Sequence, residues 1–257
     1  MIIYYALLAS SVLAIPSSRE RFDLRQASRG KAGRSSLPKQ SNVTHPEYSS
    51  NWAGSVIGGN TWKQVTGTFT VPVAQEPVGG TGQHAASVWV GIDGDTCQTA
   101  IFQTGIDLYV NEGTVTYDAW SEWWPYNAEL FSGITINAGD SITLTVLSWY
   151  ESDNQHATAI ITNNANGQVV EVQYSGFPAL CEQDAEWIVE DFQLDGAQVP
   201  FANFGTITFT SALAYTYYGA VSWPAEGDTW NIVSSTGQVL TSVTTDESTT
   251  TISYIGN

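Results

Sequence analysis

Carboxylates and side-chain amides are the groups in this chain that could do chemistry, because other reactive residues are scarce. The chain has three histidines, His45, His84 and His156, and no two of them have the spacing of metal ligands. No G-x-S-x-G turn presents a serine for a Ser-His-Asp triad, and the D-[ST]-G turns of paired-aspartate hydrolases are absent. Gly-rich phosphate loops are absent as well. Hydrolysis would therefore use carboxyl groups for proton transfer and amides as hydrogen-bond donors.

One carboxylate stands between apolar neighbours in the segment 185–192. Strand alternation places Glu190 on the face that also carries Glu186, Ile188 and Phe192. Loss of hydration favours the protonated form of such a carboxyl group, which suits proton exchange in acid. The pattern alone fits equally a structural role, in which Glu190 decorates a solvated strand face.

One amide has a comparable position in the segment 98–103. Gln103 shares a strand face with Ile101 and Thr99. A buried amide must be paired within the protein or must serve a ligand. The pattern alone again leaves a structural glutamine as the alternative.

The elements that must position these residues are β-strands. From Ser49 onward, short runs rich in Val, Ile, Thr, Trp and Phe alternate in character and are separated by Gly, Asn, Asp and Pro clusters. No stretch supports a long amphipathic helix. Many strands at this spacing predict an all-β sandwich or barrel. The runs include 65–71, 86–92, 114–124, 142–149 and 207–210, and a hairpin formed by 157–162 and 168–174.

The first part of the chain differs in composition from the rest. An apolar run through Ala14, broken at Pro16, predicts a signal peptide at residues 1–16. Residues 17–47 are rich in Ser, Arg and Gln and predict a removable propeptide, with a glycosylation sequon at Asn42. Residues 48–257 would then form a single β domain, for which a 257-residue chain with 42% hydrophobic residues has ample core.

The charges follow the same division. Residues 1–44 hold seven basic and two acidic side chains, net +5, whereas the remainder holds Lys63 against 23 carboxylates, net −22. Such an acidic body repels phosphates, so we expect no nucleic-acid partner. Cys97 and Cys181 are the only cysteines, and in an exported chain they predict one disulfide, with two unpaired buried thiols as the alternative.

In the segments around Gln103 and Glu190, the chain resembles the glutamic peptidase (eqolisin) family of fungal secreted acid endopeptidases. Several long motifs carry the resemblance, which extends from about Ser49 to the end of the chain. The matching strings are 50–54 (SNWAG), 88–97 (VWVGIDGDTC), 99–105 (TAIFQTG), 117–120 (YDAW) and 185–191 (AEWIVED).

The resemblance implies a fold and roles for particular residues. The implied fold is a sandwich of two antiparallel, strongly bent sheets, with the active site on the concave face. Gln103 and Glu190 fall on the family's catalytic positions, and Cys97 and Cys181 on its disulfide. The resemblance also implies that Trp52 and Trp89 form walls of the substrate cleft. It implies that Asp93 and Asp107 orient the glutamine. One departure is Ser121, where relatives carry tyrosine, which would alter subsite preference if this position lines the cleft.

The resulting expectation is a secreted acid endopeptidase, insensitive to pepstatin, monomeric, and made as a zymogen inhibited by its own propeptide. It would need no metal, cofactor or membrane, and its partners would be protein or peptide substrates. Two alternatives remain. A β-sandwich glycoside hydrolase would need a second carboxylate facing Glu190, for which Glu122 is the candidate. A carbohydrate-binding module would use the ten tryptophans without turnover.

Overall fold

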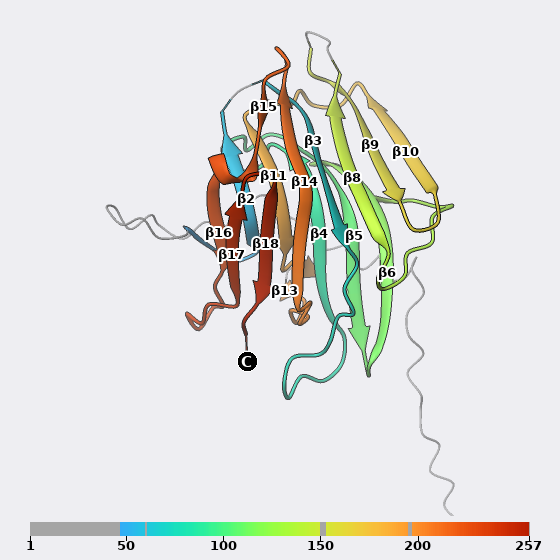
Figure 1. Ribbon diagram of the computed structural model, residues 1–257, viewed down its shortest axis with the longest axis vertical. Helices are drawn as coiled ribbons and strands as arrows, with labels where there is room; N and C mark the ends of the chain where they lie inside the picture. The colour runs from blue at the N-terminus through green and yellow to red at the C-terminus, as the bar shows by residue number, and fades with distance from the viewer. Residues whose placement is uncertain (1–46, 60, 150–152, 195–196, 257) are drawn as a thin grey trace, which may run out of the picture.

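A computed structural model describes residues 47–59, 61–149, 153–194 and 197–256. Two eight-stranded sheets pack face to face (Figure 1), and the only helix among these residues is the 3-10 turn Pro224–Glu226. None of the described helical structure has the length and hydropathy of a membrane span. The all-β sandwich expected from the sequence is confirmed. The signal peptide, the propeptide and Asn42 lie outside the described residues.

The first sheet carries the residues that could do chemistry. Its neighbours are antiparallel except β1 and β16, which pair in parallel at one edge of the sheet. Its strands in spatial order are β1 (Glu47–Ser49), β16 (Asp228–Ile232), β2 (Trp52–Gly58), β11 (Asp184–Glu190), β4 (His84–Ile92), β5 (Ile101–Asn111), β6 (Thr114–Trp124) and β7 (Glu129–Leu130).

The second sheet backs the first. Its strands in spatial order are β10 (Gln168–Ser175), β9 (His156–Asn163), β8 (Ser141–Ser148), β3 (Trp62–Thr70), β14 (Thr206–Thr216), β18 (Thr249–Tyr254) and β17 (Thr241–Asp246), and β15 (Val221–Ser222) pairs with β14. A separate pair is formed by β12 (Gln193–Leu194) and β13 (Ala197–Gln198).

Strand alternation explains how the second sheet packs. In β8, the residues Ile142, Leu144 and Val146 point into the space between the sheets, while the serine and threonines between them are half-exposed. Strands β4 and β5 have both faces covered, so nearly all their residues are buried. A period-2 pattern is therefore visible in the second sheet and hidden in the central strands of the first.

The expected strands are present with modest changes at their ends. The hairpin is confirmed, with β9 and β10 joined through a turn at Gly167, whose φ of 75° favours glycine. The run at 207–210 is the first part of the longer β14. The grouping of Thr99 with Gln103 is wrong, because β5 begins at Ile101 and Thr99 lies in the preceding loop beside Cys97.

Candidate active site

One face of the first sheet gathers the predicted catalytic residues, and we call it the site face. It is the face turned away from the core between the sheets. Its apolar floor is a cluster of buried residues from six strands and the β6–β7 loop, packed separately from the main core. The members of the site face used below are Trp52, Ser87, Trp89, Gly91, Gln103, Gly105, Asp107, Asp118, Trp120, Glu122, Glu186, Ile188 and Glu190.

Glu190 occupies the last position of β11, where it is 5% exposed. Its Oε2 accepts a hydrogen bond from Trp89 Nε1 at 3.0 Å, and its Oε1 accepts a longer one from Asn51 Nδ2 at 3.4 Å. Both donors are neutral, so they orient the carboxyl group without fixing its charge. Both carboxyl oxygens of Glu190 are thus held by hydrogen bonds, and the group can accept or release a proton on the site face.

Gln103 lies on the same face in β5 and is 1% exposed. Its Nε2 donates to Glu122 Oε2 on the neighbouring strand β6, with 2.5 Å between nitrogen and oxygen. Its Oε1 is buried and has no hydrogen-bond partner among the described residues. The amide is therefore tethered at one end only, which is the arrangement expected of a group that serves a ligand.

The sheet register sets how the two residues relate. Glu190 pairs with Ser87 of β4, whereas Gln103 pairs with Gly91 of the same strand. Glu190 and Gln103 therefore lie in two rows of paired residues that cross the sheet. These rows are four residues apart along β4, about 13 Å at ordinary strand rise. Trp89 stands between them and bonds to Glu190. A bound chain crossing Trp89 would have Glu190 on one side and Gln103 on the other.

Two glycines allow the tryptophans to pack this tightly on the sheet. A Cβ on Gly105 would lie 2.4 Å from Val88 O and 2.6 Å from Trp89 Cβ. A Cβ on Gly91 would lie 2.8 Å from Trp89 Cζ3 and 3.1 Å from Glu186 Oε2. A side chain at Gly91 would displace the Trp89 ring, and one at Gly105 would clash with the β4 backbone, so these glycines are needed for packing.

Trp52 and Trp89, the predicted cleft walls, do lie together on the site face. Their rings meet edge to face, with centroids 5.0 Å apart and planes at 75°, and both are fully buried. Trp52 is also the strand partner of Glu190 on β2. The pair thus encloses Glu190 from two sides, and its role toward a substrate stays a prediction.

Asp93 makes its hydrogen bonds away from Gln103. Its carboxylate accepts the backbone N–H groups of Cys181, Glu182 and Gln183 at 2.7–2.9 Å. These bonds fix the loop that leads into β11, which the disulfide between Cys97 and Cys181 also ties down. The predicted disulfide is confirmed, and closing its 84-residue loop stabilises the fold by about 4–5 kcal/mol. The expectation that Asp93 orients Gln103 has no support from these contacts.

Asp107 lies on the site face but in the row of Glu190. It is fully buried, pairs with Ser87, and accepts a hydrogen bond from Tyr109 Oη at 3.1 Å. Gly105 separates it from Gln103 along β5. Asp107 therefore adds a buried carboxyl group to the row of Glu190, and its predicted role in orienting Gln103 stays a prediction.

Ser121, the departure noted in the sequence, does not point onto the site face. It faces the second sheet, where its Oγ lies 2.9 Å from Tyr174 Oη on β10. Its neighbour Glu122 takes the site-face position. An effect of Ser121 on subsite preference through direct contact is therefore not supported.

Two residues of the site were not singled out from the sequence. Asn51 donates to Glu190, and its only signal is its place in the motif 50–54. Ser87 is fully buried between Glu190 and Asp107, and its Oγ has no partner among the described residues. A serine inside an apolar run carries no signal of its own, because its importance depends on the two strands beside it.

Asp191 follows Glu190 and is a second buried acid at this end of β11. Burial, reinforced by the charge of Glu190, raises its pKa well above the usual range. Burial likewise raises the pKa of Asp93 to about 6, although three backbone N–H groups partly offset the rise. A raised folded-state pKa contributes stability that is present below the unfolded value of 3.8 and lost as pH rises.

We therefore expect the melting temperature to fall as pH rises from about 4 to beyond 6, with Asp93 alone contributing on the order of 3 kcal/mol. Asp191→Asn removes one titrating group and should reduce this fall. The matched control is Asp246→Asn, at an exposed carboxylate on β17. This control should leave the fall in melting temperature unchanged. Melting curves at acid and neutral pH for the three chains check this, and a wild type that is more stable at neutral pH would contradict it.

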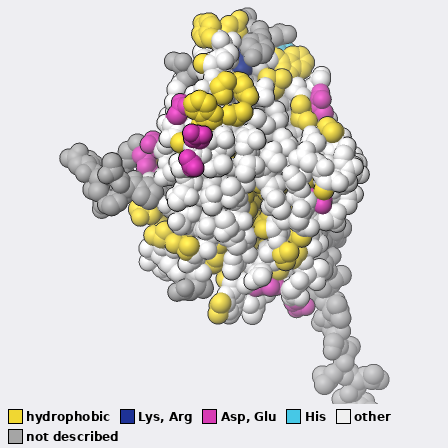
Figure 2. Space-filling model, in the orientation of Figure 1, with side chains coloured by type: hydrophobic (Ala, Val, Ile, Leu, Met, Phe, Trp, Pro, Cys, Tyr) yellow, Lys and Arg dark blue, Asp and Glu magenta, His cyan; other side chains and the backbone are white. Residues whose placement is uncertain are grey.

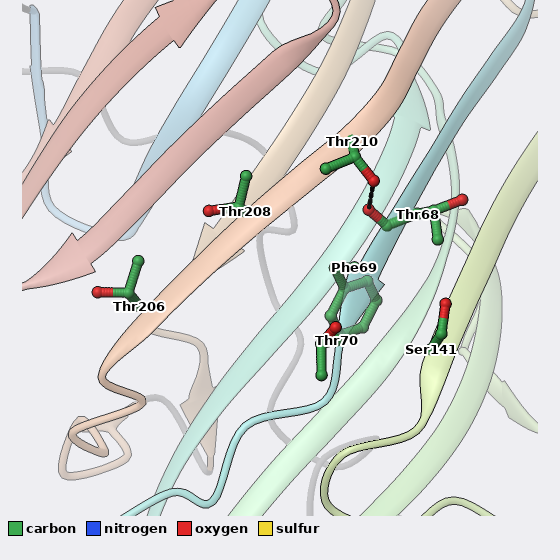
Figure 3. A pocket seen from close by; sticks show the side chains of 7 residues that line it. All are labelled: Thr68, Phe69, Thr70, Ser141, Thr206, Thr208 and Thr210. Atoms are coloured by element: carbon green, nitrogen blue, oxygen red, sulfur yellow. Dashed lines mark hydrogen bonds between the residues drawn. The ribbon is translucent and has the colours of Figure 1, made fainter. Parts of the chain in front are cut away.

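One hollow lies on the outer face of the second sheet, and it lacks the groups that hydrolysis requires. Figure 2 shows the face of the second sheet, where uncharged polar atoms dominate and acidic side chains lie toward the rim. Figure 3 shows a pocket on this face lined by Phe69, Ser141 and five threonines, in which Thr210 Oγ1 donates to Thr68 O at 3.1 Å. It offers no carboxylate or amide side chain, so the site face is the better candidate.

Comparison with known proteins decides the class of this site. Residues 50–254 match the peptidase A4 family. Aspergillopepsin-2 of Aspergillus niger is 39% identical over 279 residues, which cover 97% of each chain. The chain belongs to the peptidase A4 family. It is accordingly a peptide-bond hydrolase of the glutamic type, as the motifs around Gln103 and Glu190 indicated.

Further family members agree in sequence and in structure. Scytalidopepsin B of Scytalidium lignicola is 39% identical over 217 residues, covering 80% of each chain. The crystal structure of scytalido-glutamic peptidase with a transition-state analogue inhibitor matches with a TM-score of 0.72 at 36% identity, covering 80% of this chain and 98% of that one. Aspergilloglutamic peptidase from Aspergillus niger matches with a TM-score of 0.63 at 43% identity, covering 67% and 99%.

Proposed function

We propose that this chain is the precursor of a secreted, pepstatin-resistant acid endopeptidase in which Glu190 and Gln103 form the catalytic pair. The observation that carries the proposal is their common placement on the site face, each buried and held by neutral or acidic neighbours. Pepstatin resistance is expected because the site offers no pair of D-[ST]-G aspartates for such an inhibitor to bridge. Residues 1–16 would direct secretion.

The chemistry divides between the two side chains. Glu190 takes a proton from a water molecule as the oxygen attacks the scissile carbonyl carbon. The Gln103 amide donates a hydrogen bond to the oxygen that becomes negative, and being neutral it keeps its donor hydrogens at any pH. Glu190 then passes its proton to the departing nitrogen, which completes hydrolysis with no net change in the enzyme. Trp52 and Trp89 would line the path of the substrate.

The glycoside hydrolase alternative fits the site poorly. Its second carboxylate, Glu122, lies on β6, three strand spacings from β11 and four residues along the strands from Glu190, or about 20 Å between backbones. Glycosidase pairs stand about 5–10 Å apart. Glu122 is also engaged by Gln103. The substrate class is tested by offering the acidified chain denatured protein and a β-glucan; cleavage of the glucan alone would overturn the proposal.

We further propose that residues 17–47 inhibit the enzyme until it meets acid. The supporting observation is charge: this segment is basic, while the site face carries Glu122, Glu186, Glu190 and Asp107. Among the described residues the only lysine or arginine is Lys63, and its Nζ is already bonded to Glu182. Attraction between the two parts would weaken as the carboxylates take up protons.

A synthetic peptide of residues 17–47 tests this second proposal. Added to the acid-treated enzyme, it should inhibit in weak acid and lose at least about tenfold in affinity as pH falls or salt rises. A control peptide with glutamine at all seven basic positions should inhibit weakly throughout. Equal inhibition by both peptides would show that charge does not hold the segment to the enzyme.

A further inference from the structure

Glu122 is the one side chain that the structure shows bonded to the Gln103 amide, and the proposed catalytic pair assigns it no part. It is fully buried, and its Oε2 accepts from Gln103 Nε2 at 2.5 Å. With this bond in place, the amide oxygen is the end left without a partner among the described residues. The donor end of the amide is thus turned toward Glu122, whereas an oxyanion requires donors on the side open to substrate.

The protonation state of Glu122 decides which end of the amide it can hold. An ionised carboxylate is only an acceptor, so it must face the NH₂ group. A protonated carboxyl group can donate its O–H, so it can face the amide oxygen instead. Turning the amide by half a revolution exchanges its oxygen and nitrogen with almost no change in shape. In that orientation the NH₂ group occupies the place of the partnerless oxygen.

The surroundings of Glu122 favour the uncharged form in acid. The buried carboxyl groups on the site face are Asp107 on β5, Asp118 on its own strand β6, and Glu186 and Glu190 on β11. The phenol of Tyr109 on β5 donates a hydrogen bond to Asp107. Strand β7 adds Glu129, which is exposed. Glu186 is fully buried in the same row, next to Gly91, so two carboxyl groups flank one amide without solvent.

No described cation offsets these charges. Lys63 is bonded to Glu182 and to Trp149 O, and the His84 ring lies 3.1 Å from Gly82 O. His156 stacks on Trp149 with ring centroids 5.6 Å apart. Protonation is then the available way to relieve repulsion among the carboxyl groups of the site face.

We propose that Glu122 is a positioning residue that makes activity depend on acid: once protonated, it donates to Gln103 Oε1 and turns the NH₂ group toward the substrate. The proton comes from solvent and stays on Glu122 through the reaction, so the step consumes nothing. This inference rests on the proposed role of Gln103 as the oxyanion donor. It differs from that role in that Glu122 acts through Gln103 and never touches the reacting atoms.

The variant Glu122→Gln mimics the protonated form, because its NH₂ group can donate to Gln103 Oε1 at every pH. We expect its kcat/KM in acid to stay within about threefold of wild type. The pH at which kcat/KM falls on the alkaline limb of the pH profile should rise by about one unit or more. The matched control Glu129→Gln, a nearby exposed glutamate, should leave the limb in place. An unmoved limb in Glu122→Gln, or a uniform loss at every pH, would overturn the proposal.

A second measurement does not depend on any variant at Glu122. The protein is labelled with ¹⁵N-glutamine, and the NMR spectra of the wild type and Gln103→Ala are compared. The side-chain NH₂ signal that is missing from the variant belongs to Gln103. That signal should shift in the wild type over the pH range in which kcat/KM falls, and a signal constant across that range would overturn the proposal. If Gln103→Ala and Glu190→Gln retain activity, the catalytic pair itself is wrong. If they are inactive while the limb and the signal stay fixed, only the role of Glu122 is wrong.

Discussion

Glu190→Gln should lower kcat/KM for a denatured protein substrate by on the order of 10⁴-fold. The amide is nearly identical in shape, and its oxygen can still accept from Trp89 Nε1, so the site should keep its packing. What is lost is the ability to take a proton from water and return it to the leaving nitrogen. Because both steps use the same carboxyl group, one substitution removes both, and KM should change little.

The control for this variant is Asp191→Asn, which removes a buried acid at the next position without touching the proposed proton transfer. It should retain measurable turnover under conditions in which Glu190→Gln has none. Initial rates in acid, with circular dichroism to verify the fold, distinguish the two. Activity in Glu190→Gln within tenfold of wild type would exclude Glu190 as the proton-transfer group.

Gln103→Ala should lower kcat by about 10²–10³-fold, the usual effect of removing one oxyanion donor. The cavity it leaves and the loss of a partner for Glu122 should also lower stability, by about 1–3 kcal/mol. Measuring kcat and KM separately shows whether the lost interaction belongs to the transition state. A loss confined to KM would mean that Gln103 binds substrate without stabilising the oxyanion.

Gln103→Glu is the companion variant, because a carboxyl group can donate only while protonated. It should lose activity as pH rises more steeply than wild type does. It also places two carboxyl groups within hydrogen-bond distance, since Glu122 is the partner at this position. Full activity of this variant across the wild-type pH range would contradict the assignment of Gln103 as a neutral donor.

The sequence predicted the sandwich because the strands of the second sheet alternate visibly. In β8 every second residue from Ile142 to Val146 is apolar, so the period and the buried face can both be read directly. The central strands of the first sheet conceal this signal, since β4 is buried on both faces. The order of strands in each sheet was not predictable, because pairing such as β2 with β11 joins segments about 130 residues apart.

The two catalytic candidates could be located from motifs, but their relationship could not. Alternation placed Gln103 and Glu190 each on a strand face, while the row that each occupies depends on pairing with β4. The contacts of Asp93 could not be predicted either. Its carboxylate turns onto the 181–183 loop because φ of 71° reverses the chain there, a backbone feature with only a weak sequence signal in Asp-Gly.

Glu122 shows most clearly which part of the site could not be predicted from the sequence. From the sequence it was the candidate partner of Glu190 for a glycosidase, on the ground of strand alternation. The register instead pairs it with Gln103, one strand away, and the two side chains bond. A difference of two residues in strand pairing would have changed its chemistry, and that pairing cannot be read from the residues of one strand alone.

The central claim is that Glu190 and Gln103 together hydrolyse peptide bonds. The most direct test is the initial rate at which new amino termini appear in a denatured protein at about pH 4, with pepstatin present. The rate is measured for the wild type, Glu190→Gln, Gln103→Ala and the control Glu129→Gln. We predict cleavage by the wild type and the control, and losses of about 10⁴-fold and 10²–10³-fold in the two site variants. Cleavage by both site variants at the wild-type rate would contradict the account.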